Sequence, residues 1–217
     1  MMTARSAANP PKYRKLILQL VSGMIVGALA GYFVFAWLDG QGTMFEDGSR
    51  AFAIGVGLVY SLMGLVVALG LIAPGPGAHL LNVEDATEIV EQRGILWPSA
   101  IASLLIGLAL LVLGVGGEGA MIEPIPAFLL AAVGLGGATA ITVATRDRND
   151  EMMRAVSRDS SVLSLTLGGI LLSLWGGLAH LGLASWIEPL GLVAGIYALL
   201  FFSVLLVAGR RGLLMPR

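Results

Sequence analysis

One histidine and a set of uncharged polar side chains are the residues that could carry chemistry within the apolar stretches of this chain. His180, in GGLAHLGLASW, is the only strongly titratable residue inside an apolar stretch. An imidazole there could bind haem or a metal, or relay a proton. The only other histidine, His79, lies in a distant polar loop, and there is no cysteine. Because a lone histidine without a carboxylate or thiolate companion makes a poor metal site, we interpret His180 as a hydrogen-bonded interfacial residue.

The uncharged polar side chains of the apolar stretches could line a narrow polar path or hold a sodium ion through oxygen atoms. They are Gln19, Ser22, Tyr60, Ser61, Thr139, Thr142, Thr145 and Tyr197. Serine and threonine in apolar helices more often bond to their own backbone or across a helix contact. No proline lies at the middle of an apolar stretch, whereas many transporters have broken helices there. We therefore favour a structural role for this set.

Charge is concentrated in residues 146–159, RDRNDEMMRAVSRD, where eight of fourteen residues are charged although the whole chain is 12% charged. Asn149 is predicted to cap a helix whose first turn holds Asp150 and Glu151. Asp150 and Arg154 have the spacing of an ion pair on a helix. The sequence thus predicts a short polar helix in this segment.

Two interpretations of this charged segment remain open. It is either a solvated connector that anchors the topology or a docking surface for a cytoplasmic or membrane partner. The exposed-looking Met152 and Met153 favour docking, because methionine is common at adaptable binding surfaces. The predicted docking residues are Asp150, Glu151, Met152, Arg154 and Arg158.

Signatures of catalysis are missing from the sequence. There is no HExxH, no GxSxG, no GxxxxGK[ST] and no pair of carboxylates within an apolar stretch. A serine hydrolase would need a base beside its serine, and Ser173 is two turns from His180 on the same predicted helix. We expect no enzymatic activity, no metal, no cofactor and no nucleic-acid partner.

The elements that position these residues are long apolar helices. The chain has 57% apolar residues, thirty glycines and a mean hydropathy of +0.87. The apolar stretches are continuous and have the length of about 20 residues that a helix needs to cross a bilayer, which disfavours a barrel of alternating strands. We predict one all-α integral membrane domain, 1–217, with six transmembrane helices. The spans are 16–38, 51–73, 95–117, 124–145, 162–184 and 189–209.

The basic residues predict how these helices are oriented. Residues 1–15, the loops 74–94 and 146–161, and the tail 210–217 would lie on one side, and they hold twelve of the thirteen lysines and arginines. Only Arg50 falls on the other side. Cytoplasmic segments carry the basic excess, so we expect both termini in the cytoplasm and the protein in the plasma (inner) membrane.

A second polar segment precedes the third span. Asn82 is predicted to cap a short amphipathic helix with Glu84 and Asp85 in its first turn and Arg93 in its last. The order of residue types matches the segment that Asn149 begins. Such a likeness would follow from duplication of a helix pair or from capping chemistry alone. We expect short amphipathic segments before the third and fifth spans.

Glycines Gly23, Gly27 and Gly31 recur every four residues in the first span, so they line one face. This spacing lets two helix backbones approach closely. The face is predicted to pack against a neighbouring helix of the same chain or, alternatively, against a second copy.

Taken together, the sequence predicts a non-enzymatic accessory or scaffold protein. Its partners would be the lipid bilayer and either another membrane protein or a second copy of the chain. The alternative is a small-solute or ion transporter without intramembrane carboxylates. That alternative predicts a water-accessible cavity near Tyr60, Thr142 and Tyr197.

Overall fold

The computed structural model describes residues 21, 23, 25, 27–36, 48–81, 83 and 85–213, and this part of the chain is helical. A short apolar helix covers Gly27–Ala36. The elements that follow are α2 (Gly48–Ile72), α3 (Pro74–Leu81), α4 (Ala86–Glu91), α5 (Arg93–Val115), α6 (Pro124–Thr145), the 3-10 turn η1 (Arg146–Arg148), α7 (Glu151–His180) and α8 (Pro189–Arg210).

Five helices are long and apolar enough to cross a membrane, namely α2, α5, α6, α7 and α8. They correspond to the second to sixth predicted spans, and the all-α class is confirmed for the described residues. The first predicted span, 16–38, is described only in part, as residues 21, 23 and 25 and the short helix Gly27–Ala36. The count of six therefore stays a prediction.

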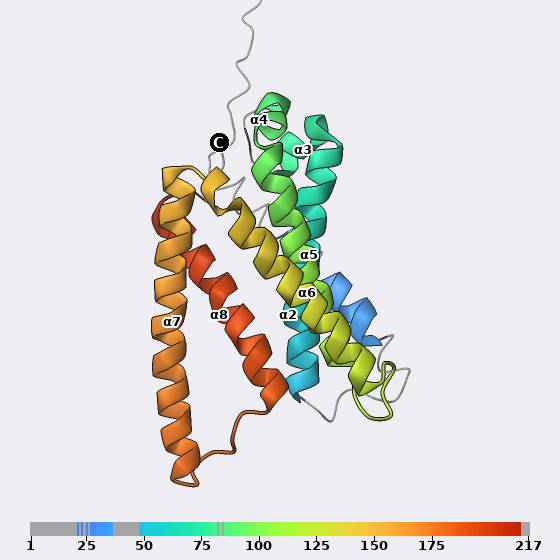
Figure 1. Ribbon diagram of the computed structural model, residues 1–217, viewed down its shortest axis with the longest axis vertical. Helices are drawn as coiled ribbons and strands as arrows, with labels where there is room; N and C mark the ends of the chain where they lie inside the picture. The colour runs from blue at the N-terminus through green and yellow to red at the C-terminus, as the bar shows by residue number, and fades with distance from the viewer. Residues whose placement is uncertain are drawn as a thin grey trace, which may run out of the picture.

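The long helices alternate in direction (Figure 1). The α3–α4 segment, η1 and the end of α8 lie together at one end of the molecule. Seven of the eight described arginines lie at this end, and Arg50 lies at the other. The seven, which define what we call the basic end, are Arg93, Arg146, Arg148, Arg154, Arg158, Arg210 and Arg211.

Helices α2 and α5 pack with their backbones in contact. A Cβ atom added to Gly107 would lie 2.7 Å from the Gly57 carbonyl oxygen and 2.5 Å from the Ser61 nitrogen. One added to Gly64 would lie 2.8 Å from the Ala100 carbonyl oxygen. Because lipid removes the hydrophobic drive between helices, such close packing of small residues is what holds them together.

Small residues of α5 recur every seven positions, which is about two helical turns, so each series keeps to one side of the helix. Ala100, Gly107 and Gly114 face α2. Ala109 and Gly116, the residue just after α5, face α6, where they pack against Gly134 and Ala127 respectively. Helix α5 is therefore the central element that joins α2 to α6.

The chain bends sharply after α2 and forms α3, where the sequence predicted only a polar loop. Gly77 lies so close against α2 that an added Cβ atom would be 2.7 Å from the Gly70 Cα. Leu71, Ala78 and Ile89 then form a buried cluster that joins α2, α3 and α4. Proline at a first helical position explains the prediction error, since Pro74 can start a helix as well as end one.

The short helix α4 is confirmed, but its cap differs from the prediction. The Glu88 backbone N–H donates to the Asp85 carboxylate at 2.9 Å, so Asp85 is the N-cap. Asn82, the predicted cap, lies outside the described residues. Arg93 also donates from its side chain to the Leu71 carbonyl at 3.1 Å, which fixes the start of α5 against the end of α2.

Helix α7 is a single helix of 30 residues, about 45 Å long, that includes most of the charged segment. The predicted amphipathic segment before the fifth span is thus the first part of α7 itself. The cap is Asp150, whose carboxylate accepts the Met153 N–H at 2.6 Å, and not Asn149. Both side chains can cap a helix, and here Asn149 is instead the last residue before the cap.

The C-terminal end of α7 comes at His180, four residues before the predicted 184. Gly182 adopts a left-handed φ of 73° there, and the Leu183 N–H donates to the Leu178 carbonyl at 2.9 Å. This is the hydrogen-bond pattern of a Schellman motif, which stops the helix.

Helices α7 and α8 form a hairpin, and α8 packs against α2 (Figure 1). The Tyr60 hydroxyl of α2 donates to the Tyr197 carbonyl of α8 at 2.9 Å. The Tyr60 ring also lies 6.0 Å from that of Tyr197 and 5.9 Å from that of Phe201, between ring centroids. This aromatic cluster is a polar and ring contact between the hairpin and α2, within the longer packing of α8 on α2.

Candidate functional site

A pocket of about 620 Å³ lies between η1 and the first three turns of α7, beside the charged segment. Three arginines line it: Arg146 from η1, and Arg154 and Arg158 from α7. We call this the basic pocket. Ser157 and Ser161 lie on the same stretch of α7 and complete its polar wall.

Few protein groups compensate the charge of the basic pocket. Within the described residues, the guanidinium groups of Arg146 and Arg154 have neither a hydrogen bond nor an ion pair. The Nε atom of Arg158 lies 3.6 Å from the Asp159 carboxylate, and its side chain is 78% exposed. Glu151 is the acidic residue of the lining. The pocket therefore offers positive charge to an anion.

The predicted ion pair between Asp150 and Arg154 is wrong. The Asp150 carboxylate is directed at the Met153 N–H as the helix cap. Arg154 donates its backbone N–H to the Asp150 carbonyl and leaves its side chain in the pocket lining. Because the Asp150 carboxylate caps the helix, the Arg154 guanidinium remains available to bind an anion.

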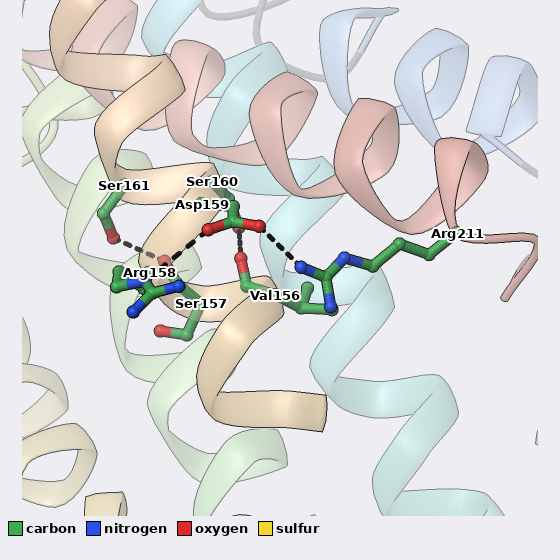
Figure 2. A network of polar contacts seen from close by, with 7 residues as sticks. All are labelled: Val156, Ser157, Arg158, Asp159, Ser160, Ser161 and Arg211. Atoms are coloured by element: carbon green, nitrogen blue, oxygen red, sulfur yellow. Dashed lines mark hydrogen bonds and ion pairs between the residues drawn. The ribbon is translucent and has the colours of Figure 1, made fainter. Parts of the chain in front are cut away.

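A polar network joins the two helices of the hairpin next to the basic pocket (Figure 2). Arg211, just after α8, donates to the Asp159 carboxylate at 2.5 Å. Ser160 donates to the Val156 carbonyl, and Ser161 donates to the Ser157 carbonyl at 2.8 Å. The Ser160 and Ser161 hydroxyls are therefore satisfied within their own helix, and Asp159 carries the polar contact between the two helices.

The predicted docking residues all lie on the first two turns of α7 or at its cap, and all are exposed. Glu151, Arg154 and Arg158 line the basic pocket, because positions three and seven residues apart share a helix face. Met152 and Met153 are 42% and 44% exposed. Docking through these residues stays a prediction. The sequence did not single out Arg146, although its position in the same charged segment was a signal.

The glycine face of Gly23, Gly27 and Gly31 has no neighbour among the described residues, since a Cβ atom on any of them would meet nothing within 4 Å. A packing role for these three glycines stays a prediction. The close packing that the structure does contain uses glycines spaced by seven residues, such as Gly57 and Gly64.

Among the described residues, the structure does not bring the threonines of α6 together with Tyr60 and Tyr197. The Thr139, Thr142 and Thr145 hydroxyls each donate at 2.8 Å to the carbonyl four residues earlier in α6. Tyr60 and Tyr197 lie instead between α2 and α8. Gln19 and Ser22 lie outside the described residues. Within the described part, the hydroxyls of Ser61 and Ser203 are buried without a hydrogen-bond partner.

His180 is the last residue of α7, exposed, and at the end opposite the basic end. Among the described residues, no group of three His, Cys, Asp or Glu side chains is close enough to hold a metal. His79 lies in α3, near the basic end. The two histidines are therefore separated by the length of the bundle.

Comparisons with protein-family models, with curated proteins and with solved structures found no match to this chain. The fold and the distribution of residues are thus what place it in a class. Five long apolar helices make it a helical integral membrane protein.

Proposed function

We propose that this chain is a non-enzymatic, multi-pass protein of the plasma (inner) membrane that assembles with a second copy or with another membrane protein, in an accessory or scaffold role. The observation that carries the proposal is the exposure of α7. Of its most apolar stretch, 6% is buried, against 39% for α2. A helix that contacts little of its own chain has a long face available for another.

The outward surface of α7 has features of a helix-packing face as well as of a lipid-facing one. Gly169 and Gly177 would have nothing within 4 Å of an added Cβ atom. At Gly57 of α2 and Gly107 of α5, by contrast, a neighbouring helix occupies the space where a Cβ atom would lie. Small residues mark close helix contacts in membranes, so the open glycines of α7 support a partner helix there.

Crosslinking tests this assembly. The chain has no cysteine, so single cysteines can be introduced without background. Leu165 is 79% exposed on α7, and Ser164 is 8% exposed where α7 meets α8. In native membranes we expect Leu165→Cys to give crosslinked adducts and the matched Ser164→Cys to give none. A chain that stays monomeric in mild detergent, with equal crosslinking of the two variants, would contradict the proposal.

The orientation that we propose places the basic end in the cytoplasm, because cytoplasmic segments carry the Lys and Arg excess. Both chain termini would then be cytoplasmic. An impermeant maleimide should label Glu118→Cys in intact cells and Asn149→Cys only after permeabilisation. The reverse labelling pattern would invert the topology.

A small-solute or ion transporter is the second candidate. The buried, unpartnered hydroxyls of Ser61 and Ser203 are the observation in its favour, since polar groups in a membrane interior often serve transport. This candidate requires that Tyr197→Cys react with an aqueous thiol reagent. Protection of that cysteine would favour the assembly role.

A further inference from the structure

We propose that the basic pocket binds the phosphate group of an anionic phospholipid, such as phosphatidylglycerol, at the basic end of the molecule. The pocket of about 620 Å³ is large enough for a headgroup. Three arginines and one glutamate line it, and Arg158 alone of the three arginines has an ion pair among the described residues, with Asp159, so the charge of the pocket favours an anion.

The arginines of the pocket suit a phosphodiester in particular. A guanidinium presents paired N–H donors that match two phosphate oxygens. The guanidinium groups of Arg146 and Arg154 have no protein acceptor among the described residues. Binding a phosphate there therefore breaks no hydrogen bond within the protein. The Asp150 carboxylate already accepts the Met153 N–H at the start of α7. Recognition of the phosphate therefore depends on the arginine side chains.

The pocket continues into apolar surface, which favours a lipid over free phosphate. Its lining extends along α7 to Val162, which is 60% exposed. On the neighbouring helix, Val143 of α6 is 67% exposed. Helices α6 and α7 meet near the pocket and diverge away from it (Figure 1). A headgroup held by the arginines would thus place its acyl chains along these two apolar helices.

Native mass spectrometry of the full chain in a non-ionic detergent tests this site. The protein is titrated with phosphatidylglycerol, with phosphatidylcholine and with inorganic phosphate. Arg146→Gln should weaken phosphatidylglycerol binding about fivefold, since a basic residue contributes about 1 kcal/mol toward anionic lipid. Arg148→Gln is the matched control, because Arg148 lies in the same 3-10 turn but does not line the pocket.

The double variant Arg146→Gln/Arg154→Gln should lose more phosphatidylglycerol binding than Arg146→Gln alone. Arg146→Lys should retain part of the binding, because it keeps the positive charge. Equal losses for Arg146→Gln and Arg148→Gln would overturn the site. Equal binding of the two lipids would overturn the anionic selectivity. Displacement of the lipid by millimolar inorganic phosphate would show free phosphate to be the ligand. The spectrum reports bound lipid as the added mass of the lipid and assembly as the added mass of a second protein. The lipid-binding proposal and the assembly proposal can therefore be contradicted independently.

Discussion

Helices α2 and α5 touch backbone to backbone, whereas α7 packs mainly against α8 and buries little of its surface within the described chain. At Gly107 the opposing helix is 2.5 Å from where a Cβ atom would lie, and at Gly169 there is nothing within 4 Å. Both residues are glycines in the interior of long apolar helices. The same residue type therefore serves intramolecular packing in one region and leaves an open surface in the other.

The two regions also differ in how they are held. The α2–α5 contact is a continuous series of close approaches, while the α7–α8 hairpin adds polar ties to its packing, namely the Tyr60 cluster against α2 and the Arg211–Asp159 ion pair between its own helices. Van der Waals contact spread over a whole helix is hard to remove with one change. A few separate polar ties can each be removed singly. We therefore expect α2 and α5 to be the stable part and the hairpin to be the adaptable part.

The largest effect should come from Gly107→Leu. The side chain would collide with the backbone of α2 near Ser61, which cannot move without separating the helices. We expect a loss of about 3 kcal/mol in the free energy of unfolding, at the upper end of overpacking effects. Thermal unfolding in mild detergent, followed by circular dichroism, measures it.

Gly169→Leu is the control for this prediction, because its Cβ atom enters open space. Its stability in detergent should stay within about 1 kcal/mol of the natural chain, which is the scale of glycine helix propensity. Equal losses of stability in Gly107→Leu and Gly169→Leu would contradict the difference in packing between α5 and α7.

The fold could be predicted from sequence where its determinants are local. The five described spans follow from continuous apolar stretches, and the basic end follows from charges that lie outside them. The errors came where two local solutions were equally good. Asn149 and Asp150 can each cap a helix, and Pro74 can either end α2 or start α3.

The candidate site was less predictable, because it depends on tertiary placement. The basic pocket forms because η1 lies beside α7. The turn at Asn149 sets that arrangement, and no sequence motif marks it. The sequence indicated Arg154 and Arg158 but not Arg146. Likewise, the sequence shows a four-residue glycine spacing that begins at Gly23, while the close packing of α5 uses a spacing of seven.

A smaller effect is expected from Tyr60→Phe, which removes the hydrogen bond to the Tyr197 carbonyl and keeps the ring contacts. One such bond is worth about 1 kcal/mol. Amide hydrogen exchange should rise in α8 more than in α5, because the change loosens the hairpin. Tyr32→Phe, at a residue 68% exposed, should change neither helix. Equal increases in α8 and α5 would mean that the two regions unfold as one unit.

The smallest effect should come from Arg211→Gln, which breaks the ion pair with Asp159. The two side chains are 34% and 41% exposed, so water and salt screen the pair. We expect a loss of about 0.5 kcal/mol at low salt, as for other partly exposed pairs. At 1 M salt the Debye length falls to about 3 Å, and the difference from the natural chain should vanish.

Arg210→Gln is the matched control for this last change, since Arg210 has no ion pair among the described residues and the same charge is removed from the same helix end. A salt-sensitive loss in Arg211→Gln alone would show that this contact holds the hairpin closed beside the basic pocket. An equal loss in both variants would instead reflect the removal of positive charge near the negative end of the α8 dipole. The contact between α7 and α8 would then rest on the buried face of Val156, Ser160 and Ser164.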